Sequence, residues 1–172
     1  MPLLCPIDNL KDSHEVVVCD TEFSRQAHKE LFRFSDEVYI TADDSAKVFA
    51  ALESIVNSCN SESSVSPSKI HVVIVWENLI KISLWKSAKP TVGDAFTILK
   101  NTGISSQELQ PFKTADINDL FPWLYYGKRF DILRKICHAT KKQVESRLKN
   151  HTIRVDSHLI AEDTKRIVAS SL

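Results

Sequence analysis

Short apolar runs alternate with amphipathic segments along the first half of the chain. Residues 14–20 contain the run VVVC, which is apolar at every position and predicts a strand buried on both faces. Residues 37–41 and 69–76 predict two more strands, and KIHVVIVW in the second is the strongest strand signal in the sequence. Residues 25–34 and 43–57 carry apolar side chains at helical spacing. The pattern therefore predicts the order β-α-β-α-β.

The second half of the chain is helical in pattern. Residues 79–85 fit either a strand or the start of a helix. Residues 130–148 show a long helical periodicity, and residues 160–169 predict a final helix. An alternation of strands and helices is typical of a central sheet with helices on both sides. The expected fold class is α/β, a three-layer sheet with flanking helices.

The length of 172 residues suits one domain, and no internal repeat divides the chain. We therefore interpret residues 1–172 as a single α/β domain. Within it, Pro2 and Pro6 predict an irregular lead-in over residues 1–13. Residues 58–68, which are rich in Ser, Asn and Pro, predict a mobile loop.

The cysteine content and hydropathy indicate where the protein works. The four cysteines are far apart and include no CxxC pair, which favours free thiols over disulfides or a zinc site. No apolar stretch is long enough to span a bilayer, so no membrane is expected. We expect a cytoplasmic or nuclear protein.

The charge is balanced overall but unevenly distributed. Residues 1–86 carry 8 Lys and Arg against 13 Asp and Glu, whereas residues 87–172 carry 14 against 9. The basic excess is concentrated between Lys128 and Arg154. Two interpretations stay open for this stretch, a solvated helix face or a surface that binds nucleic acid. Its candidate binding residues are Lys128, Arg129, Arg134, Lys135, Lys141 and Lys142.

An aromatic group directly precedes the basic stretch. It consists of Phe121, Trp123, Tyr125 and Tyr126, with Pro122 placed to start or bend a helix. Aromatic rings beside Lys and Arg can stack on nucleobases, form the dry centre of a protein interface, or belong to the core. All three interpretations stay open, and the first two make these rings candidate binding residues.

The segment VVVCDTEF places two carboxylates at the end of a predicted strand. Asp20 and Glu22 are two residues apart, a spacing that can hold divalent metal ions through oxygen ligands. A capping role for Asp20 at the following helix is the structural alternative.

The segment HLIAEDT near the C-terminus carries a second polar group. His158 precedes Asp163 by five residues, on the expected entry to the final helix, and can act as a general base beside a metal-bound carboxylate. The alternative is that Glu162 and Asp163 only stabilise the first turn of that helix.

Together the two segments resemble the DEDDh class of 3′–5′ exonucleases, the DnaQ-like family. DTEF is similar to that family's first motif, and HLIAEDTKRIVASSL is similar to its third. The resemblance implies that Asp20, Glu22 and Asp163 bind two Mg²⁺ or Mn²⁺ ions. It also implies that His158 deprotonates the attacking water.

The sequence departs from that family in two places. The position nearest the expected carboxylate of the second motif holds Lys81, whose charge opposes metal binding. The family follows its first motif with antiparallel strands, whereas residues 25–34 have a helical pattern.

Two hypotheses about function follow. In the first, the protein is a non-catalytic interaction subunit without a cofactor. Such a subunit would bind a protein partner, a nucleic-acid-processing assembly being one setting, and could contact nucleic acid through the basic stretch of residues 128–154. In the second, it is a metal-dependent DEDDh-type 3′–5′ exonuclease or a degenerate, inactive relative. Whether the protein is an enzyme stays open at this point.

Overall fold

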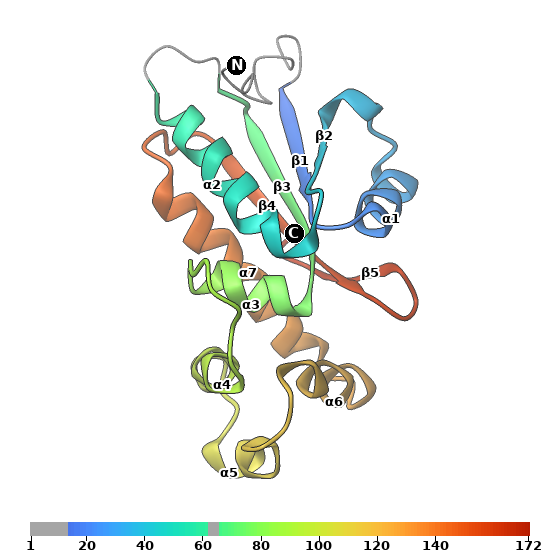
Figure 1. The fold of residues 1–172 in the computed structure, drawn as a ribbon, viewed down its shortest axis with the longest axis vertical. Helices are drawn as coiled ribbons and strands as arrows, with labels where there is room; N and C mark the ends of the chain where they lie inside the picture. Colours follow the sequence, from blue (N-terminus) through green and yellow to red (C-terminus); the bar gives the residue numbers. More distant parts are fainter. Residues whose placement is uncertain (1–13, 62–65) are drawn as a thin grey trace.

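The computed structural model describes residues 14–61 and 66–172 (Figure 1). Its five strands are β1 (Glu15–Cys19), β2 (Tyr39–Thr41), β3 (Lys69–Val75), β4 (Arg154–Ala161) and β5 (Arg166–Ser170). Its α-helices are α1 (Glu22–Phe32), α2 (Val48–Cys59), α3 (Trp76–Ser83), α4 (Val92–Asn101), α5 (Ser106–Leu109), α6 (Leu120–Tyr126) and α7 (Phe130–Arg147). The expected lead-in over residues 1–13, Cys5, and residues 62–65 of the expected loop lie outside the described residues.

The strands form one sheet in the order β2-β1-β3-β4-β5. The first four strands are parallel, and β5 pairs antiparallel with β4 at the edge. Parallel neighbours need crossover connections, which α1, α2 and the long helical segment between β3 and β4 supply. The α/β fold class and the β-α-β-α-β order of the first half are therefore confirmed.

Alternate residues of the central strands enter two separate apolar clusters. Val16 and Val18 face one side of the sheet, and Val17 and Cys19 face the other. All four side chains have no exposed surface, as predicted for a strand covered on both faces. The sheet is therefore the middle layer of three.

The larger cluster lies between the sheet and helices α2, α3 and α7. Helix α7 packs directly along β4, and α3 contacts α7, β3 and β4 (Figure 1). The long, fully buried side chains of this face include Leu52, Ile55, Ile70, Ile74, Leu79 and Leu133. Burial of this much apolar surface is the main stabilising contribution to the fold.

Within residues 14–61 and 66–172, α1 is the helix that covers the opposite face. Thr21 caps this helix, its hydroxyl accepting a hydrogen bond from the Ser24 amide at 3.1 Å. The apolar cluster under α1 is small and is made of Val17, Cys19, Ala27, Val38, Val73, Val75 and Ile160. Three histidines, His28, His71 and His158, are buried on the same face.

Helices α4, α5 and α6 extend beyond the carboxyl ends of the parallel strands (Figure 1). The indole Nε1 of Trp76, at the start of α3, donates to the carbonyl of Ile117 at 2.9 Å. This bond ties the connection before α6 to the end of β3. Pro122 lies in the first turn of α6, which agrees with the expected helix start.

The expected final helix over residues 160–169 is wrong. Residues 154–161 form β4, a four-residue turn follows, and residues 166–170 form β5. Strand β4 pairs with β3 over seven residue pairs, which completes the buried centre of the sheet. This tertiary pairing outweighs the local helical pattern. Residues 79–85, which fitted a strand or a helix, lie mainly in α3.

None of the helices in residues 14–61 and 66–172 combines the length and the apolar character that crossing a bilayer demands.

Candidate functional site: a groove at the carboxyl edge of the sheet

Three adjacent parallel strands, β1, β3 and β4, end at the same edge of the sheet. Asp20 follows β1, Glu77 and Asn78 lie in the first turn after β3, and Glu162 follows β4. Strands β2 and β3 flank β1, and the helices that follow β1 and β2 cover opposite faces. In open α/β sheets, ligands bind in the crevice outside such a switch point.

Asp20 is a buried carboxylate that joins three segments, with only 1% of its surface exposed. Its Oδ1 accepts from the Ser24 hydroxyl at 2.7 Å. Its Oδ2 accepts from the Val75 amide and from the Asn78 side chain, both at 2.8 Å. Burial raises the pKa of Asp20, and the hydrogen bond from Asn78 opposes that rise. Both oxygens therefore have protein partners, and Asp20 fixes the geometry of this edge.

Asn78 links this carboxylate to the segment after β2. Its Nδ2 also donates to the Ser45 hydroxyl at 2.8 Å. Beside it, the ammonium of Lys81 lies 3.4 Å from the Ala46 carbonyl, and only 4% of Lys81 is exposed. Residues 44–46 are thereby held against α3, and the two segments form opposite walls of a cleft.

The cleft has a volume of about 390 Å³ and a mostly charged and polar lining. Its charged side chains are three carboxylates and two ammonium groups, namely Asp44, Glu77, Glu162, Lys81 and Lys89. Burial, followed by the negative charges of Asp20 and Glu77, raises the pKa of Glu162. With three carboxylates against two ammonium groups in its lining, the cleft carries an excess of negative charge, which attracts cations.

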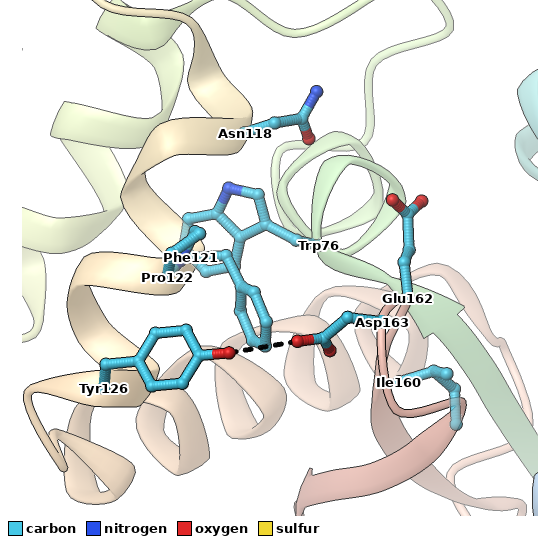
Figure 2. Close-up of a pocket in the computed structure, with 8 residues that line it drawn as sticks. All are labelled: Trp76, Asn118, Phe121, Pro122, Tyr126, Ile160, Glu162 and Asp163. Carbon is cyan, nitrogen blue, oxygen red and sulfur yellow. Dashed lines mark hydrogen bonds between the residues drawn. The ribbon is translucent and has the colours of Figure 1, made fainter.

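A second, apolar pocket of about 190 Å³ adjoins the cleft (Figure 2). Its walls are Trp76, Phe121, Pro122, Tyr126 and Ile160, and Figure 2 shows their side chains around the space. The hydroxyl of Tyr126 donates to Asp163 Oδ2 at 3.1 Å, which bridges α6 to the β4–β5 turn. Asn118 and Glu162 line both spaces. We call the cleft and the pocket together the edge groove.

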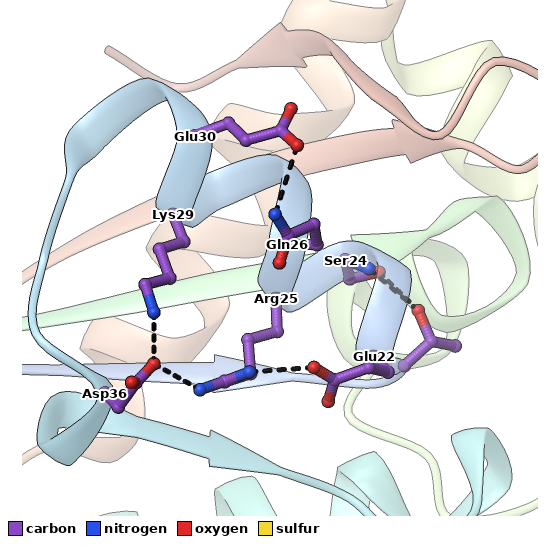
Figure 3. Close-up of polar contacts among 8 residues, drawn as sticks. Glu22, Ser24, Arg25, Gln26, Lys29, Glu30 and Asp36 are labelled. Carbon is purple, nitrogen blue, oxygen red and sulfur yellow. Dashed lines mark hydrogen bonds and ion pairs between the residues drawn. The ribbon is translucent and has the colours of Figure 1, made fainter.

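The three carboxylates singled out from the sequence occupy different environments. Asp20 lies at the end of β1 behind the cleft wall. Glu22 is exposed in the first turn of α1, where it pairs with Arg25 at 2.7 Å (Figure 3). Asp163 lines the apolar pocket and accepts from Tyr126. Glu162, its neighbour, is the carboxylate whose pKa responds to the charge of Asp20.

His158 does not lie on a loop that enters a helix, as the sequence pattern suggested. It is the fifth residue of β4 and has no exposed surface. Its Nδ1 lies 2.7 Å from the Ser170 hydroxyl of β5, and its ring faces α1. Because of this burial, His158 lines neither part of the edge groove.

The aromatic group from the sequence divides between groove and core. Phe121 and Tyr126 line the apolar pocket. Tyr125 stacks on Phe121 with ring centroids 5.6 Å apart, and Trp123 packs on Phe112 at 4.8 Å. Phe121 and Tyr126 are therefore available to a ligand, Tyr125 contacts both of them, and Trp123 packs elsewhere, on Phe112.

The basic side chains of residues 128–154 are not gathered at the groove. Arg134, Lys135 and Lys142 are exposed along α7, and Lys128 lies in the α6–α7 connection. Arg129 lies 3.5 Å from Glu108, and Lys141 lies 3.8 Å from Asp156. Most of the basic excess therefore covers the outer surface of α7, as in a solvated helix face.

Sequence reasoning missed several residues of the groove. Glu77 and Asn78 follow the strongest strand in the sequence, and that position at a strand end was the available signal. Glu162 was assigned to a helix turn because β4 was not recognised. Among the described cysteines, burial raises the pKa of the Cys137 thiol to about 12 and also raises that of Cys19. Neither thiol is a nucleophile at neutral pH.

No protein-family model, curated protein or solved structure matches the chain. The function is therefore argued from the groove itself.

Proposed function

We propose that the protein binds the end of a single-stranded nucleic acid in the edge groove, bridged by a divalent cation, as a subunit of a nucleic-acid-processing assembly. The observation that carries this proposal is the union of an aromatic pocket and a carboxylate-lined cleft through Asn118 and Glu162. A nucleotide has the same two parts, a flat base and a charged phosphate.

The apolar pocket suits the base. Trp76, Phe121 and Tyr126 present ring surfaces, and Asn118 offers an amide that can hydrogen-bond a base edge. Base stacking on an aromatic side chain contributes about 1–3 kcal/mol and tolerates any base. The expected binding is therefore weakly dependent on sequence.

The cleft suits a phosphate only with a metal ion. Its carboxylates outnumber its ammonium groups, so a bare phosphate would be repelled. Mg²⁺ binds one or two carboxylates together with phosphate oxygens, and Glu77 and Glu162 are the accessible candidates here. Lys81 and Lys89 can then contact the phosphate directly.

Hydrolysis of the bound strand is the second candidate function. Glu77 and Glu162 line the cleft together, and the negative charge of Glu77 contributes to the raised pKa of Glu162, so two carboxylates could share one metal ion with the phosphate. Because His158 lies outside the groove, the attacking water would be activated by the metal ion rather than by that histidine. The DEDDh resemblance of the DTEF segment supports the same candidate, whereas Lys81 in the cleft opposes it.

The assembly part of the proposal rests on an exposed aromatic rim that extends from Tyr126, at the edge of the groove, to Phe130. Tyr126 is 69% exposed and Phe130 is 39% exposed, and Tyr125 contacts both rings. Adjacent exposed aromatic side chains are typical contacts at the centre of protein interfaces.

Binding is tested by fluorescence anisotropy with short labelled single strands of RNA and DNA, in Mg²⁺, in Mn²⁺ and in EDTA. We expect binding with either metal and loss of binding in EDTA. Tyr126→Ala should weaken binding about tenfold, since it removes one stacking surface. Phe130→Ala is the matched control because Phe130 does not line the groove. Equal binding in EDTA, or no binding in Mg²⁺, would overturn the proposal.

The same samples separate binding from hydrolysis. Shortening of a 5′-labelled strand in Mg²⁺ that disappears in Glu162→Gln would establish hydrolysis at this site. Glu30→Gln, on the exposed surface of α1, is the control for loss of a carboxylate elsewhere. Intact strands with metal-dependent binding would leave the non-catalytic proposal standing alone.

A further inference from the structure

Three histidines from three different elements meet under α1. His28 lies on α1, His71 on β3 and His158 on β4, with exposed fractions of 0%, 2% and 0%. Their ring centroids are 5.2 to 5.8 Å apart. One ligand nitrogen from each ring lies within 4.8 Å of the corresponding nitrogen of the other two. We call this group the histidine cluster.

The sheet register explains how the cluster forms. His71 faces the same side of the sheet as Val73 and Val75, and Val73 pairs with His158 on the next strand. Parallel pairing therefore sets the two strand histidines side by side, with rings stacked at an interplanar angle of 11°. The third ring, that of His28 on α1, packs against both strand histidines in a nearly T-shaped arrangement.

The outer nitrogens of two rings have fixed partners. His28 Nδ1 lies 2.8 Å from the Tyr39 hydroxyl, and His158 Nδ1 lies 2.7 Å from the Ser170 hydroxyl. Hydrogen bonds of this kind to the second ring nitrogen orient metal-binding histidines. On His71, the carboxylate of Glu15 lies 3.7 Å from Nε2.

The remaining nitrogens have no hydrogen-bond partner within the described part of the chain. They are Nε2 of His28, Nε2 of His158 and both nitrogens of His71, and all are buried. Each buried polar atom left without a partner costs about 1–3 kcal/mol. Three such side chains in one place are rare in a folded core, and a metal ion bound by one nitrogen of each ring would satisfy three of these four atoms.

We propose that the histidine cluster is a buried zinc site, with one nitrogen each of His28, His71 and His158 as three ligands and a water as the fourth. Zn²⁺ prefers imidazole nitrogen and tetrahedral geometry at about 2.0–2.1 Å. Those bond lengths place ligand nitrogens about 3.3 Å apart. The ligand nitrogens, which lie within 4.8 Å of one another, therefore approach by at most about 1.5 Å when zinc binds, which rotations about the side-chain bonds can supply.

The surroundings favour a structural role rather than a catalytic one. Phe32 stacks on His28 with centroids 4.4 Å apart, and Phe34 meets the edges of His28 and His71 at 5.5 and 5.4 Å. The nearest charged groups are Glu15 and the ion pair between Lys69 and Asp156, at the other end of the strands from the edge groove. A metal in this buried, aromatic shell has no path to a substrate, and it would join α1 to two central strands.

The inference is independent of the nucleic-acid proposal and is tested on tag-free full-length protein. Elemental analysis should find about one zinc per chain after purification without chelator. Apo protein titrated with Co²⁺ should show the visible absorption of a tetrahedral site, saturating at one equivalent and abolished by Zn²⁺. Apo protein that gives no such absorption, with unchanged circular dichroism, would overturn the proposal.

Variants assign the ligands. His28→Gln and His158→Gln should each weaken Co²⁺ and Zn²⁺ binding by about 100-fold or more, since each removes one direct ligand. His138→Gln and His151→Gln are the matched controls, because both positions lie outside the cluster. Circular dichroism and urea unfolding check that each variant folds. Tight binding that survives the double variant His28→Gln/His158→Gln would show that the metal lies elsewhere.

Discussion

The two faces of the sheet are stabilised in different ways. On one face, α2, α3 and α7 bury a continuous apolar core with side chains such as Leu52, Leu79 and Leu133. On the other face, α1 is the one covering helix in the described part of the chain, and it lies over a small apolar cluster and three buried imidazoles. The strands supply β-branched residues to both faces alike, so the difference comes from the helices and from the histidines.

Because of this difference, we expect pH and metal ions to change the stability of the α1 face much more than that of the larger core. A core of aliphatic side chains is stabilised by burial and packing, which depend little on pH or on metal ions. Buried imidazoles with unsatisfied nitrogens depend on both. Four predictions separate the two faces, beginning with the largest expected effect.

Leu79→Ala should produce the largest loss of stability. Leu79 has no exposed surface and lies between α3 and α7, so the substitution leaves a cavity in the larger core. We expect the free energy of unfolding in urea to fall by about 3 kcal/mol. The fall should be the same in EDTA and in Zn²⁺. A loss under about 1 kcal/mol would mean that this face relaxes around the cavity and is not tightly packed.

Zn²⁺ should stabilise the wild-type protein through the α1 face. At a free concentration 100-fold above the dissociation constant, the free energy of unfolding should rise by about 2.7 kcal/mol. Leu79→Ala should keep the whole increase because its cavity is on the other face. His28→Gln should lose it. An equal increase in His28→Gln would place the stabilising ion outside the histidine cluster.

Lowering the pH from 7 to 5.5 should destabilise the metal-free protein through the same face. Burial, and then the neighbouring imidazoles, lowers the pKa of His28 to about 3 and that of His158 to about 4. In the unfolded chain both titrate near pH 6.5, so acid protonates the unfolded state first and favours it. Stability is therefore complete above about pH 6.5 and declines as the pH falls toward the folded pKa values.

We expect a loss of about 1 kcal/mol for each of these two histidines between pH 7 and 5.5, measured by urea unfolding in EDTA. Burial also lowers the pKa of His71, against the opposing charges of Glu15 and Asp156, so its contribution has the same sign. His28→Gln should show a smaller pH dependence than the wild type. An identical pH dependence in that variant would attribute the loss to other groups.

Asp36→Ala should have the smallest effect of the four. Asp36 is exposed and pairs with Arg25 and Lys29 on the outside of α1 (Figure 3). Exposed ion pairs contribute little because water screens them. The hydrogen bond from Lys29, with the nearby positive charges, lowers the pKa of Asp36, so it stays ionised between pH 7 and 5.5. The urea midpoint should shift slightly at low salt and less at high salt. A shift as large as that of Leu79→Ala would contradict this.

The central strands could be predicted because their positions are apolar without interruption. Residues 69–76 and 14–20 contain β-branched runs that suit a strand covered on both faces, and β3 and β1 formed there. Strand β4 escaped prediction because His158 and Asp156 interrupt its apolar pattern. Its strand state is decided by pairing with β3, a non-local contact that local propensity does not contain.

The candidate sites could be predicted from the sequence only where the strand next to them was recognised. Asp20 stood out at the end of an evident strand, but Glu162 lay at the end of a strand that was not recognised. The histidine cluster left no spacing pattern, since His28, His71 and His158 come from distant segments. The three rings come together only through the register of β3 with β4 and the packing of α1 on the sheet.

The β4–β5 hairpin has a consequence for the order in which the molecule assembles. In the described chain, β4 and β5 are the one pair of neighbouring strands that a short turn connects. Every other neighbouring pair is joined through at least one helix. Local pairs close rapidly, whereas distant pairs must first overcome the entropy of a long loop. The turn that holds Glu162 can therefore form early in folding. Asp20, which follows β1, and Asn78, which follows β3, reach their positions beside it later. The groove would then be among the last features to form on the folding pathway, and its completion would report that the whole sheet is in register.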